Sequence, residues 1–206
     1  MDAPTIMGAN SSDVTNAHLS HVPRTYAERM TGMFHELPLS NRQRQDESAV
    51  TGDWRLAEAD VVRAAHTLLA GRSQRDRQIL SRAFLTTAHL ARTDDTDLEG
   101  VAEGLARGER RRVRDLSRTV TALLTLARDT GASVSLAPRT SGAVALYLAT
   151  SGAFDVRAVV RGHTIRSSDD GWEFGRGPVM EDTSVRVLSF LCGISPEAPR
   201  HVAPRG

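Results

Sequence analysis

The chain has 206 residues, of which 40% are hydrophobic and 25% charged, which is typical of a globular protein. Its formal net charge of +1 excludes a global attraction to nucleic acid or membrane, so any such attraction must come from local patches. All 26 basic residues are arginine, which excludes P-loop and Schiff-base lysine chemistry. A lysine-free, arginine-rich composition is typical of a GC-rich genome, such as an actinobacterial one; selection against lysine is the alternative.

The first quarter of the chain shows little apolar periodicity. Residues 1–22 are rich in Ser, Asn, Asp and Thr, so we expect them to be disordered, and they lack the basic and apolar regions of a signal peptide. A short helix is expected within 25–38 and a polar loop over 39–52. No segment of the sequence reaches the roughly 18 consecutive apolar residues of a membrane span, so we expect a cytoplasmic protein with no membrane partner.

Apolar residues then recur every three or four positions, which predicts four helices between 53 and 130. They are expected at about 55–70, 74–92, 98–108 and 109–129, the second and third opened by capping boxes at Ser73 and Thr96. The second has the clearest stripe, which comprises Ile79, Leu80, Ala83, Phe84, Thr87, Leu90 and Ala91. In the fourth, Val113, Leu116, Val120, Leu123 and Ala127 share one face, and Gly131 ends the helix.

The pattern changes after residue 140. A short apolar helix follows Ser141, alternation over 154–160 predicts a strand that could continue to Ile165, and 172–175 is a return strand after a turn at 167–171. A last helix begins at 182 or 183, and Trp172 is expected to pack against it near Leu188 and Leu191. The fold class is therefore mainly α: a loose segment over 1–52, a helical bundle over 53–130, a small α+β unit over 140–194, and a loose tail over 195–206.

Motifs for catalysis are missing from the sequence. It contains no G-x-G-x-x-G, H-E-x-x-H, C-x-x-C or G-x-S-x-G, and we name no catalytic residue. The single cysteine, Cys192, lies in an apolar run and is expected to be an inert, buried thiol. His66 and His89 lie on neighbouring predicted helices and could begin a metal site, although two ligands do not complete one. No cofactor is expected, with zinc as the alternative.

One surface is strongly oriented. At ~100° per residue, Arg107, Arg111, Arg114 and Arg118 fall within about 60° of one another on the fourth helix, nearly opposite its apolar stripe. We call these four residues the arginine ridge. Guanidinium groups one turn apart repel weakly unless an anion or a carboxylate relieves them, so the ridge is either a solvated face balanced by Glu103, Glu109 and Asp115 or a seat for phosphates.

Residues 97–124, DLEGVAEGLARGERRRVRDLSRTVTALL, resemble a helix-turn-helix, and RDRQIL (75–80) is similar to the entry to region 4 of sigma factors. The turn position usually held by glycine is Ala106 here, and Val113 comes one residue late. This resemblance implies that the arginine ridge faces DNA.

A second resemblance covers more of the chain. HELP and DWRLAEADVVRAAHTL are similar to the N-terminal helices of the mycothiol-dependent maleylpyruvate isomerase family, and DDGWEFGRGPVMEDTSVRVLSFLCG to its small C-terminal domain. The resemblance implies a DinB-like bundle, with Trp54, Asp60 and His66 at the positions of that family's Trp, Asp and metal-binding His. The Trp-to-Asp interval is about two residues longer here, and the later Glu and His-x-x-Asp are missing.

The favoured function is a non-enzymatic binding or regulatory protein that engages nucleic acid or an acidic protein surface through the arginine ridge. The alternative is a divergent isomerase-family protein that binds a small molecule between the bundle and the C-terminal unit, with its metal site lost. The sequence does not define the oligomeric state.

Overall fold

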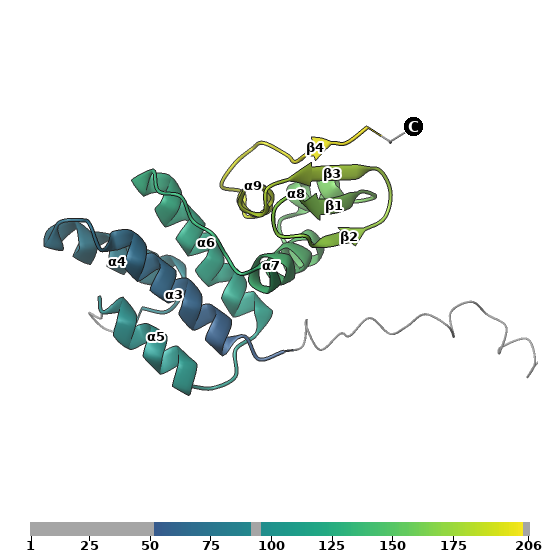
Figure 1. Cartoon of the computed structure of the whole chain (residues 1–206). Coiled ribbons are helices and arrows are strands. Elements are labelled where there is room, and N and C mark those ends of the chain that lie inside the picture. Colours follow the sequence, from purple (N-terminus) through teal and green to yellow (C-terminus); the bar gives the residue numbers. More distant parts are fainter. Residues whose placement is uncertain (1–51, 92–95, 204–206) are drawn as a thin grey trace, which may run out of the picture. The chain divides into compact units, whose positions relative to one another are not determined.

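The computed structural model describes residues 52–91 and 96–203, so the predictions for 1–22 and 25–38 lie outside it. The described chain is mainly α-helical and ends in a small mixed sheet, which confirms the predicted fold class (Figure 1). The bundle consists of α3 (Arg55–Leu69), α4 (Gln74–Thr87), α5 (Leu98–Arg107) and α6 (Val113–Thr130). The C-terminal unit consists of α7 (Pro138–Ser151), α8 (Phe154–Val160), β1 (Thr164–Ser167), β2 (Glu173–Gly175), β3 (Val179–Asp182), α9 (Ser184–Leu191) and β4 (Arg200–His201).

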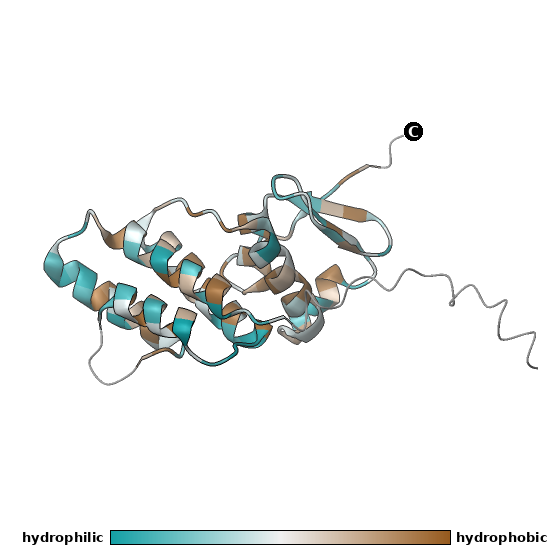
Figure 2. Ribbon diagram, turned by 60° about the horizontal axis from the view of Figure 1, so that its bottom comes forward, coloured by the Kyte–Doolittle hydropathy of each residue, from teal (hydrophilic) through white to brown (hydrophobic). Residues whose placement is uncertain are grey.

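The bundle packs around α3 and α6. Helix α3 lies against α5 and α6, and α4 packs on α6. Figure 2 shows hydrophobic segments recurring along these helices and hydrophilic segments at their turns. Helix α7 then contacts both α6 and α9, and α9 also touches α6, so the C-terminal unit packs on α6 through two helices. None of the described helices combines the length and the apolar character that crossing a membrane requires; α7 and α8 do so only as a pair, and the chain bends by 108° between them.

The buried face of α4 differs from the predicted stripe. The Ser73 hydroxyl accepts from the Asp76 amide at 3.2 Å, which confirms the start of the helix. Phe84 is buried as expected, but it is accompanied by Leu85, and Ile79 is 58% exposed. The buried face of α4 is thus shifted by about one residue relative to the predicted stripe. All of its buried residues lie in the second half of the helix.

Helix α6 begins four residues later than predicted. Its first turn is capped by Asp115, whose carboxylate accepts from the Arg112 backbone N–H at 3.3 Å, so residues 109–112 form a loop. The predicted apolar stripe is confirmed, since Leu116, Val120 and Leu123 are fully buried. Gly131, with φ 66°, ends the helix in the left-handed conformation. On α5 the N-cap is Asp97 rather than Thr96, because its carboxylate reaches the Glu99 amide.

The predicted strand over 154–160 is wrong, because these residues form α8. Val156 and Val160 are buried and lie one helical turn apart, a spacing that also fits a strand face. The other half of the proposed strand face does not pack: Phe154 is 79% exposed. The period-2 pattern therefore came from a short amphipathic helix too brief to show its own repeat.

The sheet has the order β2-β1-β3-β4. The predicted return strand is confirmed as β2, which pairs antiparallel with β1 so that Phe174 lies opposite Ile165. Strand β3 runs parallel to β1 with Met180 beside Ile165, and both side chains are buried. Strands β3 and β4 were not predicted, since four and two residues carry almost no periodic signal.

Trp172 packs against α7. Its indole N–H donates to the Ser141 hydroxyl at 2.9 Å, and its ring stacks on Phe174 with centroids 5.7 Å apart. A Cβ at Gly142 would lie 3.1 Å from the indole, so the absence of a side chain there permits the contact. The Ser141 hydroxyl in turn donates to Asp170. The indole of Trp172 is therefore held by a hydrogen bond on α7, and the expected contacts with Leu188 and Leu191 stay a prediction.

Candidate functional site

The arginine ridge does not lie on one helix. Because α6 starts at Val113, Arg107 belongs to the last turn of α5 and Arg111 to the loop between the helices. Only Arg114 and Arg118 share α6. The predicted alignment requires one continuous helix through all four arginines. The four-residue ridge is therefore wrong, because its members lie at the end of α5, in the loop and on α6.

Arg107 and Arg111 are each held by a carboxylate. Arg107 pairs with Glu103 one turn earlier on α5, on an exposed surface. Arg111 donates from Nε and NH2 to Glu58 at 2.7 and 2.9 Å, and Glu58 is fully buried. Neither guanidinium is therefore an open cation of the kind that the sequence pattern suggested.

Glu58 is the centre of a buried polar cluster. Besides the two bonds from Arg111, its carboxylate accepts from the Thr119 hydroxyl of α6 at 2.9 Å. The hydrogen bonds that Arg111 donates to Glu58 outweigh the opposing effect of burial and hold the pKa of Arg111 above its ordinary value. A buried carboxylate is stable only when paired and hydrogen-bonded, so this cluster fixes the Arg111 loop against α3 and α6.

The aromatic ring of Trp54 belongs to the same region. Its backbone N–H donates to the Arg111 carbonyl at 3.1 Å, which ties the start of α3 to the same loop. The ring is buried, and the guanidinium of Arg139, from the first turn of α7, lies 5.2 Å from its centroid. This distance fits a cation–π contact between the bundle and the C-terminal unit.

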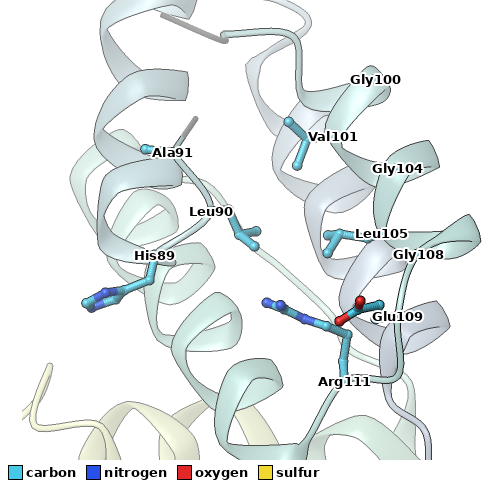
Figure 3. A pocket seen from close by; sticks show the side chains of 10 residues that line it. All are labelled: His89, Leu90, Ala91, Gly100, Val101, Gly104, Leu105, Gly108, Glu109 and Arg111. Carbon is cyan, nitrogen blue, oxygen red and sulfur yellow. The ribbon is translucent and has the colours of Figure 1, made fainter. Parts of the chain in front are cut away.

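A cavity of about 670 Å³ opens between the end of α4 and the face of α5 (Figure 3). Leu90, Val101 and Leu105 project into it. Between these side chains, Gly100, Gly104 and Gly108 leave bare backbone on the side formed by α5 and its C-terminal end. Arg111 and Glu109 point into its lower end. The cavity thus combines an apolar wall with one guanidinium that Glu58 holds in place.

The predicted metal ligands do not gather. His66 is exposed, with Nδ1 3.6 Å from the Glu99 carboxylate, and the ring of His89 points away from the cavity that its backbone lines (Figure 3). Asp60 pairs with Arg63 at 2.9 Å. Within residues 52–91 and 96–203, no three His, Cys, Asp or Glu side chains form a cluster that could hold a metal ion. The residues named for a zinc site therefore do not fit one.

Arg114 and Arg118 line a hollow of about 290 Å³ between α6, the end of α4 and the last turns of α7. Leu148 and five hydroxyl-bearing side chains complete its lining; the five are Thr87, Ser117, Thr121, Tyr147 and Ser151. Arg114 is exposed, and its side chain has no partner among the described residues. Arg118 is 3.6 Å from Asp115, which also caps α6. We call Arg114, Arg118 and this lining the α6–α7 hollow.

Cys192 and Asp169 have structural roles. Burial, opposed by the Thr121 hydroxyl at 3.2 Å, raises the pKa of the Cys192 thiol to about 11. Asp169 accepts from the Ser184 backbone N–H at 2.7 Å, so it caps the first turn of α9 from a distant turn. The cap of α9 is not visible in the sequence, because it comes from 15 residues away.

No protein-family model, curated protein or solved structure matches this chain. Its function is therefore inferred from the geometry of the α6–α7 hollow and of the cavities.

Proposed function

We propose that this protein binds a phosphate-bearing macromolecule, nucleic acid in the first place, through the α6–α7 hollow. The observation that carries the proposal is the pair Arg114 and Arg118, one helical turn apart on the wall of the same hollow. Arg114 lacks a carboxylate partner in the described chain, and the one near Arg118 is at 3.6 Å. An arriving phosphate therefore needs to displace little to form paired, charge-assisted hydrogen bonds.

The lining of the hollow supports nucleic acid over an acidic protein. The Ser151 hydroxyl can donate to phosphate and sugar oxygens, as such side chains do in nucleic-acid complexes, whereas the Thr87 hydroxyl already donates to the Ala83 carbonyl at 3.0 Å. Tyr147, which is half-buried, brings an aromatic face on which an unpaired base can stack. With two arginines, the expected affinity is modest, and log K should fall against log salt with a slope of only about two.

The experiment compares wild type with Arg114→Ser/Arg118→Ser in titrations of labelled single-stranded and duplex DNA at two salt concentrations. Each lost phosphate contact should reduce the slope of log K against log salt by about one, so about two in total. The matched control is Arg75→Ser/Arg77→Ser, which removes the same charge from the exposed start of α4. Equal slopes for wild type and Arg114→Ser/Arg118→Ser would contradict the proposal; binding of an acidic polypeptide but not DNA would favour the protein partner.

A second candidate function is small-molecule binding in the cavity between α4 and α5, which keeps the divergent isomerase-family interpretation open. The observation in its favour is the size of about 670 Å³, within the usual range for ligand pockets, together with the Arg111 guanidinium at one end. Metal analysis of protein purified without an affinity tag tests the metal side of this interpretation. One zinc per chain would support it, and a metal-free protein would leave only metal-independent binding.

A further inference from the structure

A second cavity, of about 500 Å³ and open to solvent, lies in the C-terminal unit and is lined by residues of α7, α8 and the β1–β2 hairpin. One side is apolar, formed by Leu146, Ala149, Val160, Ile165 and Phe174. The other carries three guanidinium groups, from Arg157, Arg161 and Arg176. Among the described residues no acidic side chain lines this cavity, in contrast to the cavity at Arg111, which contains Glu109.

The charge in this cavity is poorly compensated by the protein. The side chains of Arg161 and Arg176 have no partner in the described part of the chain. Arg157 donates from NH1 to the Thr150 carbonyl at a long 3.4 Å, while its Nε is buried without a hydrogen-bond partner there. His163 Nδ1, in the same lining, is also buried and unpartnered. The accessible guanidinium groups without a partner, those of Arg161 and Arg176, therefore point to a ligand that supplies acceptors.

The backbone holds Arg176 at the cavity. It lies between Gly175 and Gly177, whose φ values of 96° and 120° are unfavourable for other residues. A Cβ at Gly175 would lie 2.3 Å from the His163 carbonyl, and one at Gly177 would lie 2.0 Å from the Gly162 carbonyl. The Gly-Arg-Gly turn is therefore pressed onto the segment that also carries Arg161 and His163, which brings the cations together.

We propose that this cavity binds a small amphipathic anion, with its apolar body against Phe174 and α7 and its carboxylate or phosphate among Arg157, Arg161 and Arg176. A volume of about 500 Å³ suits a medium-length acyl chain or a bicyclic aromatic group. The site is separate from the α6–α7 hollow, since the two are lined by different residues of α7. The proposal therefore does not depend on the proposed function.

Calorimetric titration of the full chain with monomeric decanoate, decyl phosphate and decanol tests the site. We expect one decanoate or decyl phosphate per chain, and the stronger of the two identifies the head group. Neutral decanol should bind at least about tenfold more weakly, because it lacks the charge that the guanidinium groups pair with. No binding of either anion, or equal binding of decanol, would overturn the proposal.

Two variants locate the ligand. Arg161→Ser/Arg176→Ser should weaken binding of the anion by about tenfold or more, whereas Arg75→Ser/Arg77→Ser, on the exposed start of α4, should leave it unchanged. Ala149→Leu fills part of the apolar side of the cavity and keeps every arginine, so it should weaken decanoate binding as well. Thermal unfolding verifies that each variant folds. Unchanged decanoate binding in both cavity variants, or binding only to phosphatidylglycerol vesicles and not to monomeric amphiphiles, would sink the idea.

Discussion

The buried carboxylate of Glu58 accepts two hydrogen bonds from the guanidinium of Arg111, a residue 53 positions later in the chain. This pair, with Thr119 as third member, joins α3, the loop before α6, and α6 itself. Arg111, which the sequence pattern places on the surface, therefore forms a structural ion pair inside the bundle. Its energetic weight can be measured directly.

Replacing Glu58 by Ala should destabilise the protein by about 3–5 kcal/mol, because Arg111 would lose the carboxylate that it hydrogen-bonds while remaining partly buried. Urea unfolding followed by circular dichroism measures the change. The control is Glu103→Ala, which removes the exposed partner of Arg107 and should cost less than about 1 kcal/mol. Similar losses in both variants would show that burial does not distinguish the two pairs.

Phe84→Ala should cost about 3–5 kcal/mol, since Phe84 is 2% exposed and its removal leaves a cavity between α4 and the rest of the bundle. Ile79→Ala, on the same helix but at a position 58% exposed, is the matched control and should change stability by less than about 1 kcal/mol. Thermal unfolding of the two variants compares them. If Ile79→Ala proved the more harmful, the buried face assigned to α4 would be wrong.

Asp169→Asn should weaken the start of α9 by about 0.5 kcal/mol, because the amide oxygen can still accept from the Ser184 N–H but the negative charge that favours a helix N-terminus is lost. Burial raises the pKa of Asp169, but hydrogen bonds from Ser167 and Ser184 outweigh it, and the pKa lies below its ordinary value. A lowered pKa in the folded state means that this stabilisation is complete well above pH ~4 and is lost as the pH falls further.

The measurement is unfolding free energy between pH 6 and pH 2, where the variant should fall less steeply than wild type. Asp129→Asn, which removes an exposed carboxylate paired with Arg128, serves as the comparison. Parallel pH profiles for wild type and Asp169→Asn would refute the capping role.

The thiol of Cys192 should react slowly with a disulfide reagent at pH 8. Since burial raises its pKa to about 11, only about one molecule in a thousand carries the thiolate at that pH. The same reagent in concentrated urea should titrate one thiol per chain rapidly. Fast reaction of the native protein, with no lag relative to the unfolded one, would show that the thiol is accessible.

The helices of the bundle could be predicted from the sequence. The repeats on α3 and α6 are long, and side chains such as Val62 and Leu123 are fully buried as their spacing indicates. Boundaries were less predictable where the deciding group is a cap. A continuous helix from 109 agreed with the apolar stripe, and only the Asp115 cap separates that helix from the loop that carries Arg111.

The sites depended on contacts that no local pattern contains. Glu58 lies on α3 at a position typical of an ordinary helical carboxylate, and nothing near it in sequence identifies Arg111 as its partner. The sequence does not mark the Gly-Arg-Gly turn as a phosphate cradle, because its glycines precede a proline. In the fold, those glycines allow close approach to the Gly162 and His163 carbonyls instead, and they thereby position Arg176.

Helix α7 lies between two sites. Tyr147 and Leu148 line the α6–α7 hollow, and their immediate neighbours Leu146 and Ala149 line the cavity of the C-terminal unit. A rotation of this helix about its axis therefore changes both linings at once. If a ligand at one site favours a rotated state, it must alter affinity at the other, and linkage requires the same factor in the reverse direction. Titrating DNA with and without saturating decanoate would give that factor, and a value of one would mean that α7 is a rigid partition.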